Sequence, residues 1–130
     1  MTPPTPPAKS TKPVHLHLFA TLGYSIAGGR FLLRQRAAQL QVWLGVVTSI
    51  AFALAGVGLD QWAVMLALFV ASLAVEALNS AIELTVDRLS PEISEYGRDA
   101  KDLGSFAVFC ALVIFGGHAL WVLAAVLLTQ

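Results

Sequence analysis

Two long runs without a formal charge constrain the fold of this chain most. Ala37–Leu59 is about 23 residues rich in Val, Leu, Ala and Ile, and Leu103–Gln130 is equally free of Asp, Glu, Lys and Arg. A transmembrane helix needs about 20 mostly apolar residues to cross the hydrocarbon layer. The sequence therefore predicts an all-α integral membrane protein.

The predicted layout is a single membrane domain with three spans. Charged residues make up 12% of the chain, against about 25% in soluble proteins. A net charge of zero offers no bulk attraction to nucleic acid. Residues 1–13 hold five of the six prolines and predict a disordered leader. We expect an amphipathic surface helix at about 14–36 and spans at about 37–59, 62–87 and 100–128.

Basic residues predict the orientation in the membrane. None lies in the turn predicted at 58–61 or in the C-terminal tail. All of them precede the first span or separate the second from the third: Lys9, Lys12, Arg30, Arg34, Arg36, Arg88, Arg98 and Lys101. Because positively charged loops stay on the cytoplasmic side, we expect the N-terminus and a polar loop at 89–99 to face the cytoplasm.

The second predicted span carries polar side chains along one helical face. An ionised side chain at the bilayer centre costs about 2.5–3.5 kcal/mol, so such a strip needs a reason. At about 100° per residue, these residues share a wedge of about 100°: Glu76, Asn79, Ser80, Glu83 and Asp87. Aligned carboxylates suit a divalent cation or a proton acceptor. Polar contacts between helices and ion passage are alternative interpretations, and the spacing alone does not choose among them.

A second polar cluster, Gly97–Ser105, opens the third span. Lys101 can neutralise a transferring phosphate, and the Asp102 carboxylate can bind a ribose hydroxyl or a metal. The alternative is a solvated helix start, with acidic residues near the helix N-terminus and a snorkelling lysine.

Both clusters resemble the signature of a known family. Residues 76–87, Glu-Ala-Leu-Asn-Ser-Ala-Ile-Glu-Leu-Thr-Val-Asp, and residues 100–105, Ala-Lys-Asp-Leu-Gly-Ser, are similar to the small bacterial integral-membrane diacylglycerol kinases. That family includes the undecaprenol kinases. The resemblance covers about residues 14–130 and implies a homotrimer in the bacterial inner membrane, with the C-terminus in the periplasm and the active sites at the cytoplasmic interface.

The resemblance also implies a role for each matching position. Glu76 matches the catalytic base, and Glu83 matches a Mg²⁺ ligand that also contacts the nucleotide phosphate. Asn79 and Asp87 match supporting residues, while Ser105, like Glu76, falls where the lipid substrate is contacted. The remaining nucleotide contacts match Tyr24, Glu92, Ile93, Ser94, Lys101 and Asp102.

Two positions depart from the family pattern. A glutamate that joins the metal site usually stands just before the first span, and here the matching residue is Gln35 or Arg36. Its loss would weaken a second Mg²⁺ or shift its ligands, whereas Arg36 can contact phosphate directly. His17 stands where the family commonly has an arginine.

The sequence therefore predicts an ATP-dependent kinase that uses Mg²⁺ to convert diacylglycerol to phosphatidic acid. The alternatives are a kinase of undecaprenol or another lipid alcohol, a non-catalytic homologue, and an ion or proton carrier. A carrier would spread its polar groups across the bilayer, but here they gather at one end. The joint presence of the signature residues argues against a non-catalytic homologue.

Overall fold

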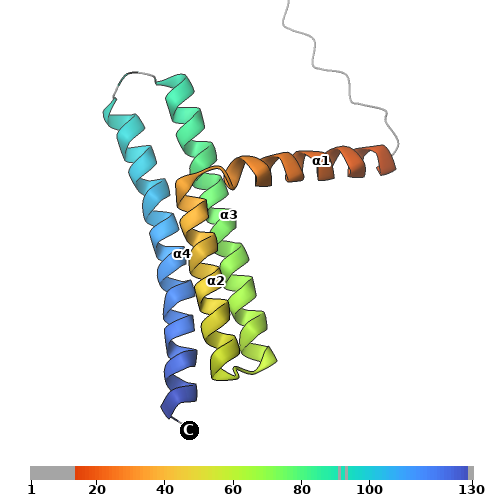
Figure 1. Ribbon diagram of the computed structural model, residues 1–130. Coiled ribbons are helices and arrows are strands. Elements are labelled where there is room, and N and C mark those ends of the chain that lie inside the picture. Colours follow the sequence, from red (N-terminus) through yellow and green to blue (C-terminus); the bar gives the residue numbers. More distant parts are fainter. Residues whose placement is uncertain (1–13, 91, 93, 129–130) are drawn as a thin grey trace, which may run out of the picture. The chain divides into compact units, whose positions relative to one another are not determined.

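The computed structural model describes residues 14–90, 92 and 94–128, and these form helices joined by short connections (Figure 1). The helices are α1 (Val14–Leu32), α2 (Arg36–Ala55), α3 (Leu59–Leu89) and α4 (Glu95–Leu128). The predicted all-α fold is confirmed. The predicted disordered leader, residues 1–13, lies outside the described residues. Residues up to Phe31 form one compact unit and residues from Leu32 form another.

The described part of the first unit is α1, a helix of 19 residues whose last residue, Leu32, already belongs to the second unit. It ends at Leu32, four residues before the boundary predicted at residue 36, and residues 33–35 form a turn. Tyr24 lies on this helix and its side chain is exposed. The location of α1 on a membrane surface stays a prediction.

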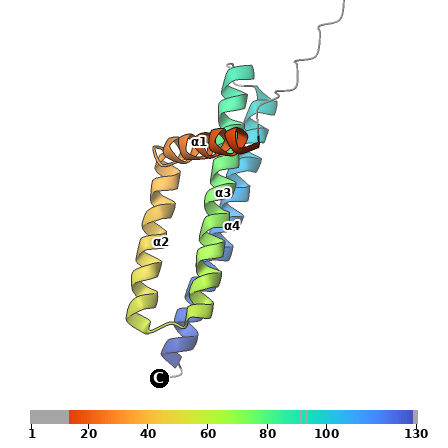
Figure 2. The ribbon, with the colours of Figure 1, turned by 90° about the vertical axis from the view of Figure 1, so that its right-hand side faces the viewer.

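The second unit is a bundle of the three long helices, each long and apolar enough to cross a membrane, as predicted. The 31 residues of α3 and the 34 of α4 give lengths of about 46 and 51 Å at about 1.5 Å per residue. Both exceed the hydrocarbon thickness of about 30 Å. They pack together along much of their length and extend past the start of α2 (Figures 1 and 2).

A glycine shifts the turn between the first two spans. Gly56 adopts a left-handed backbone with φ of 67°, and the N–H of Val57 donates to the carbonyl of Phe52 at 3.1 Å. This pattern ends a helix, because glycine takes that conformation without steric cost. The turn therefore lies at residues 56–58 rather than 58–61, and α3 begins at Leu59 rather than at Trp62.

The polar loop predicted at 89–99 is shorter in the structure. The Ser94 hydroxyl accepts a hydrogen bond from the N–H of Gly97 at 3.0 Å. A serine in this position caps a helix by satisfying one of its free donors. Consequently α4 starts at Glu95, five residues before the predicted boundary at 100, and the polar residues 95–99 are helical.

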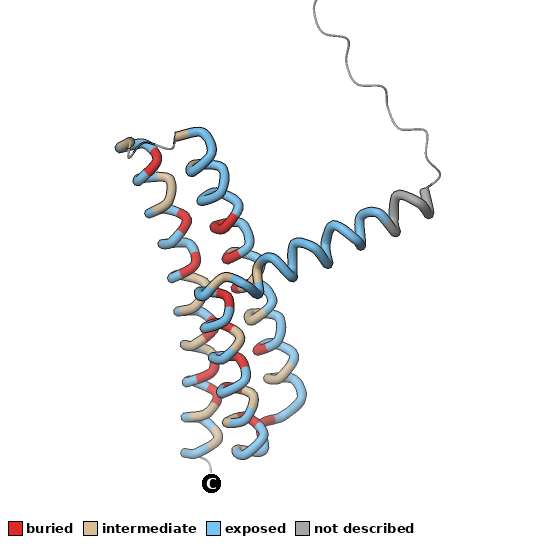
Figure 3. The backbone as a smooth tube through the Cα atoms, turned by 45° about the horizontal axis from the view of Figure 1, so that its top comes forward, coloured by how far each residue is buried: buried red, intermediate tan, exposed pale blue. Residues whose placement is uncertain are grey.

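The apolar core lies toward the end of the bundle that holds the α2–α3 turn. It is a cluster of buried residues from all three helices and the turn between α2 and α3: Phe52, Val57, Met65, Phe115, Ala119 and Val122. Most other large apolar side chains are exposed. Figure 3 marks exposed residues in pale blue along all the helices. Such an apolar surface fits contact with lipid rather than with water. Farther along α3 the buried residues become polar, and the candidate site begins there.

Candidate active site

The deepest part of the site is a carboxylate held by an amide. Glu76 of α3 and Gln41 of α2 are each 3% exposed. The Nε2 atom of Gln41 donates a hydrogen bond to Oε2 of Glu76 at 3.0 Å. A carboxylate has only acceptor atoms, so the amide must present its NH₂ group to it.

A second amide–carboxylate pair lies one turn farther along α3. Asn79 is buried, and its Nδ2 atom donates to Oε1 of Glu83 at 2.9 Å. Gly104 of α4 packs against the Asn79 amide so closely that a Cβ atom there would overlap Oδ1 and lie 3.2 Å from Cγ. The missing side chain at Gly104 is what lets α4 approach α3 at this level.

These residues open into one cavity of about 330 Å³ between the three helices, which we call the inner hollow. It combines two carboxylates with one guanidinium. Its lining comprises Gln35 just before α2, Arg36 and Ala37 of α2, Glu76, Asn79, Ser80 and Glu83 of α3, and Ser105 and Val108 of α4. Because the hollow contains acidic, basic and hydroxyl groups, it can receive a charged ligand and a hydroxyl together.

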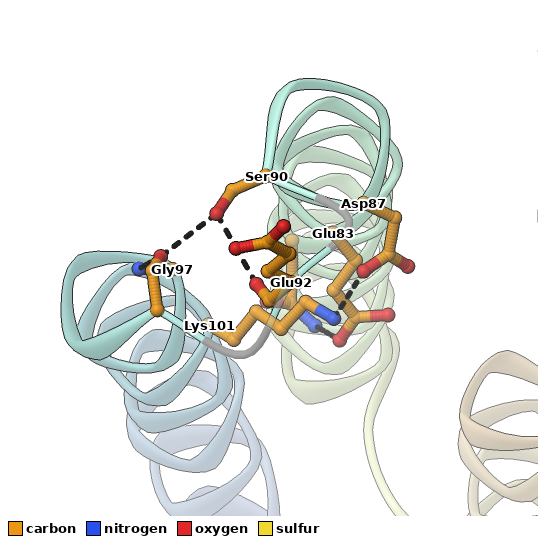
Figure 4. Close-up of polar contacts among 8 residues, drawn as sticks. Glu83, Asp87, Ser90, Glu92, Gly97 and Lys101 are labelled. Atoms are coloured by element: carbon orange, nitrogen blue, oxygen red, sulfur yellow. Dashed lines mark hydrogen bonds and ion pairs between the residues drawn. The ribbon is translucent and has the colours of Figure 1, made fainter.

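A second cavity of about 270 Å³ lies where α3 and α4 extend beyond α2, and we call it the outer hollow. Lys101 reaches across from α4 to form an ion pair with Asp87 of α3 (Figure 4). Both side chains are well exposed, so solvent screens this pair. The outer hollow is lined by Val86, Asp87, Ser90, Glu92, Ser94, Gly97, Arg98, Lys101 and Asp102.

Comparison with known proteins decides the family. A family model described as prokaryotic diacylglycerol kinase matches residues 23–123. A diacylglycerol kinase of a Sinorhizobium species is 44% identical over 82% of this chain and 77% of its own. Those of Pseudomonas aeruginosa and Escherichia coli strain K12 are 45% and 38% identical, each over 71% of this chain and 76% of their own.

The chain belongs to the prokaryotic diacylglycerol kinase family. This membership confirms the resemblance noted in the signature residues. Residues 23–123 include the whole lining of both hollows. The cavities described above therefore lie in the part of the chain that defines this family of lipid kinases.

Most residues singled out by the family signature line one of the two hollows. Glu76, Asn79, Glu83 and Ser105 line the inner one. Asp87, Glu92, Ser94, Lys101 and Asp102 line the outer one. Tyr24 lies on α1, in the other unit, and Ile93 lies outside the described residues.

Sequence reasoning missed two residues of this candidate site. Gln41 is a polar side chain inside the charge-free run 37–59, and that polarity was a signal. Gly104 follows Leu103 at the start of an apolar run, where a glycine can allow close helix packing. The contacts of these residues with Glu76 and Asn79 depend on how the helices are rotated against one another.

The close contact at Gly104 predicts a large effect of a single methyl group. We expect Gly104→Ala to lower the stability of the purified protein by about 1–3 kcal/mol, because its Cβ would force apart the Asn79 amide and α4. Thermal unfolding in detergent measures this. Gly117→Ala on the same helix is the control, since a Cβ there has nothing within 4 Å. Equal melting temperatures for the two variants would contradict the prediction.

Proposed function

We propose that this family member transfers the γ-phosphate of ATP to the hydroxyl of diacylglycerol, giving phosphatidic acid and ADP. The observation that carries the proposal is the inner hollow, which joins Glu76 and Glu83 to Arg36 and Ser105 in a single cavity. Its relatives are named diacylglycerol kinases, and this supplies the substrate class.

The chemistry assigns distinct roles to the residues of the inner hollow. The Glu76 carboxylate takes the proton of the lipid hydroxyl while that oxygen attacks the γ-phosphorus. The bond between the γ-phosphorus and the bridging oxygen breaks, and ADP leaves. Asn79 holds the Glu83 carboxylate, and Ser105 faces the lipid headgroup. Glu76 is thus the catalytic residue of the proposal.

The inner hollow also has the oxygen donors that a nucleotide-bound Mg²⁺ requires. Proteins usually hold Mg²⁺ through one or two carboxylates plus substrate phosphates. Across the described ranges no three His, Cys, Asp or Glu side chains gather to hold a metal by themselves. Glu83 lines the hollow, and the buried Oδ1 of Asn79 beside it has no hydrogen-bond partner among the described residues. We assign the ion to Glu83; when bound, it spreads the charge of the transferring phosphate.

The nucleotide would extend from the inner hollow into the outer one. Lys101 provides a flexible ammonium for the phosphates, and Asp102 provides an acceptor for a ribose hydroxyl. Glu92 and Ser94, which line the outer hollow, would border the base. Arg36 lines the inner hollow in place of the acid usual in the family. We propose that its guanidinium contacts phosphate there.

We further propose the topology and assembly that the family signature implied. The basic residues of α2, α3 and α4 lie toward the start of α2 and the connection between α3 and α4, which supports a cytoplasmic location for this end. The C-terminus then faces the periplasm of the bacterial inner membrane. The small surface that the bundle buries supports self-association, and the family resemblance implies that the assembly is a homotrimer.

An assay of phosphoryl transfer tests the proposed function directly. Purified full-length protein in lipid-containing micelles is given γ-labelled ATP, Mg²⁺ and one of three lipids: diacylglycerol, undecaprenol or a monoacylglycerol. We expect labelled phosphatidic acid as the main product. Labelling of undecaprenol alone would favour the other branch of the family, and the absence of labelled lipid from all three would contradict a kinase function.

A further inference from the structure

Gln41 is a buried amide without a place in the mechanism above. It lies on α2, inside the charge-free run 37–59, and its only described side-chain partner is the Glu76 carboxylate. Gln41 is not part of the lining of the inner hollow, whereas Glu76 is. The amide therefore contacts a carboxylate of the inner hollow without forming part of the cavity wall itself.

We infer that Gln41 is a positioning residue for Glu76. By donating to Oε2, it fixes the rotamer of the carboxylate and leaves the other oxygen, Oε1, for the lipid hydroxyl. This inference rests on the proposed function, because it gives Gln41 a role only through the proposed base. It assigns a role to α2, which the signature residues on α3 and α4 do not.

The unpaired half of the same amide supports this assignment. With its Nε2 committed to Glu76, the Oε1 atom of Gln41 is buried and has no hydrogen-bond partner in the described part of the chain. Burying an unpaired polar atom costs stability. An apolar side chain would hold α2 against α3 without that cost. Departures of this kind from good packing gather at functional sites.

The flexibility of a glutamate side chain explains why the Glu76 carboxylate needs a hydrogen bond from another helix to fix its position. A glutamate side chain has several rotatable bonds, and productive proton transfer requires it within hydrogen-bond reach of the hydroxyl. Asn79, the nearest amide on α3, donates to Glu83 instead. Gln41 is thus the described side chain that fixes Glu76 from another helix.

The test compares two glutamines that lie two residues apart on α2. Gln41→Met keeps the length of the side chain but removes the donor. Gln39→Met is the matched control, because Gln39 is exposed and its amide donates to the carbonyl of Leu33. We expect Gln41→Met to lower kcat for diacylglycerol phosphorylation by about 10- to 100-fold, with KM for ATP within about two-fold. We expect Gln39→Met to resemble the wild type.

Repeating the Gln41→Met experiment in a Glu76→Asp variant distinguishes a role of Gln41 in positioning Glu76 from a role in helix packing alone. Glu76→Asp shortens the carboxylate by one methylene group, so the Gln41 donor no longer reaches it. Residues that act as a unit lose activity non-additively. We therefore expect Gln41→Met to cost less than about three-fold in kcat in the Glu76→Asp background. The same loss in both backgrounds would overturn the inference, as would a Gln41→Met protein with normal kcat and only a lower melting temperature.

A further variant guards against a Gln41→Met protein that fails to fold. Gln41→Asn keeps a polar amide between the helices but withdraws its donor, so the same fall in kcat is expected and normal kcat would overturn the inference. The activity of the wild-type protein distinguishes a failure of this inference from a failure of the proposed function. An inactive wild type contradicts the kinase proposal, whereas an active wild type with an equally active Gln41→Asn contradicts only the role of Gln41.

Discussion

Replacing Glu76 by glutamine is expected to lower kcat for diacylglycerol phosphorylation by about 10³-fold, since a general base contributes about 10²–10⁴-fold. The fold should persist. The amide has nearly the shape of the carboxylate, and its carbonyl oxygen can take the place of Oε2 as the acceptor of the hydrogen bond from Nε2 of Gln41. Steady-state kinetics with saturating ATP and lipid measure the effect, and thermal unfolding reports on folding.

The control for this experiment is another glutamate of the same bundle. Glu95 lies in the first turn of α4, is exposed and lines neither hollow. Glu95→Gln removes the same charge and should leave kcat within about two-fold, as is usual for exposed positions away from a site. Near-normal turnover by Glu76→Gln would remove Glu76 from the role of base.

Replacing Lys101 by methionine is expected to act on the nucleotide rather than on the lipid. A hydrogen bond to a charged group is worth about 1.5–3 kcal/mol, so kcat/KM for ATP should fall by about 10- to 150-fold. KM for diacylglycerol should change little. Because Asp87 and Lys101 are both well exposed, losing their ion pair should hardly alter the melting temperature.

Arg88 provides the matched cation for the Lys101 experiment. It is exposed, follows Asp87 directly and lines neither hollow. Arg88→Met removes the same charge from the same end of the bundle, so it reports any general electrostatic attraction of ATP. Equal losses in the two variants would show that Lys101 contributes only to that general field and makes no contact with the nucleotide.

The sequence predicted the site residues best where all of them lie on a single helix. The angular positions of Glu76, Asn79, Glu83 and Asp87 follow from helix periodicity, and α3 is unbroken through all of them. Three of these residues line the inner hollow. Periodicity could not show that Glu76 is buried and that Glu83 is exposed, because burial depends on where α2 begins alongside α3.

Contacts between helices lay beyond sequence reasoning. The pairing of Gln41 with Glu76 spans 35 residues, and it depends on helix rotation and tilt, which packing sets. The predicted start of α4 was wrong for a different reason. The polar composition of residues 95–99 favours a loop, but these residues are helical. Ser94 caps the helix by accepting a hydrogen bond from the N–H of Gly97.

The exposed apolar surface of the bundle has a kinetic consequence. Large side chains such as Leu40, Trp43, Leu54 and Leu120 are more than half exposed, so the protein and a lipid substrate share the same two-dimensional phase. Their collisions depend on how many substrate molecules occupy each unit of area. Inert phospholipid therefore dilutes the substrate, whereas additional buffer does not.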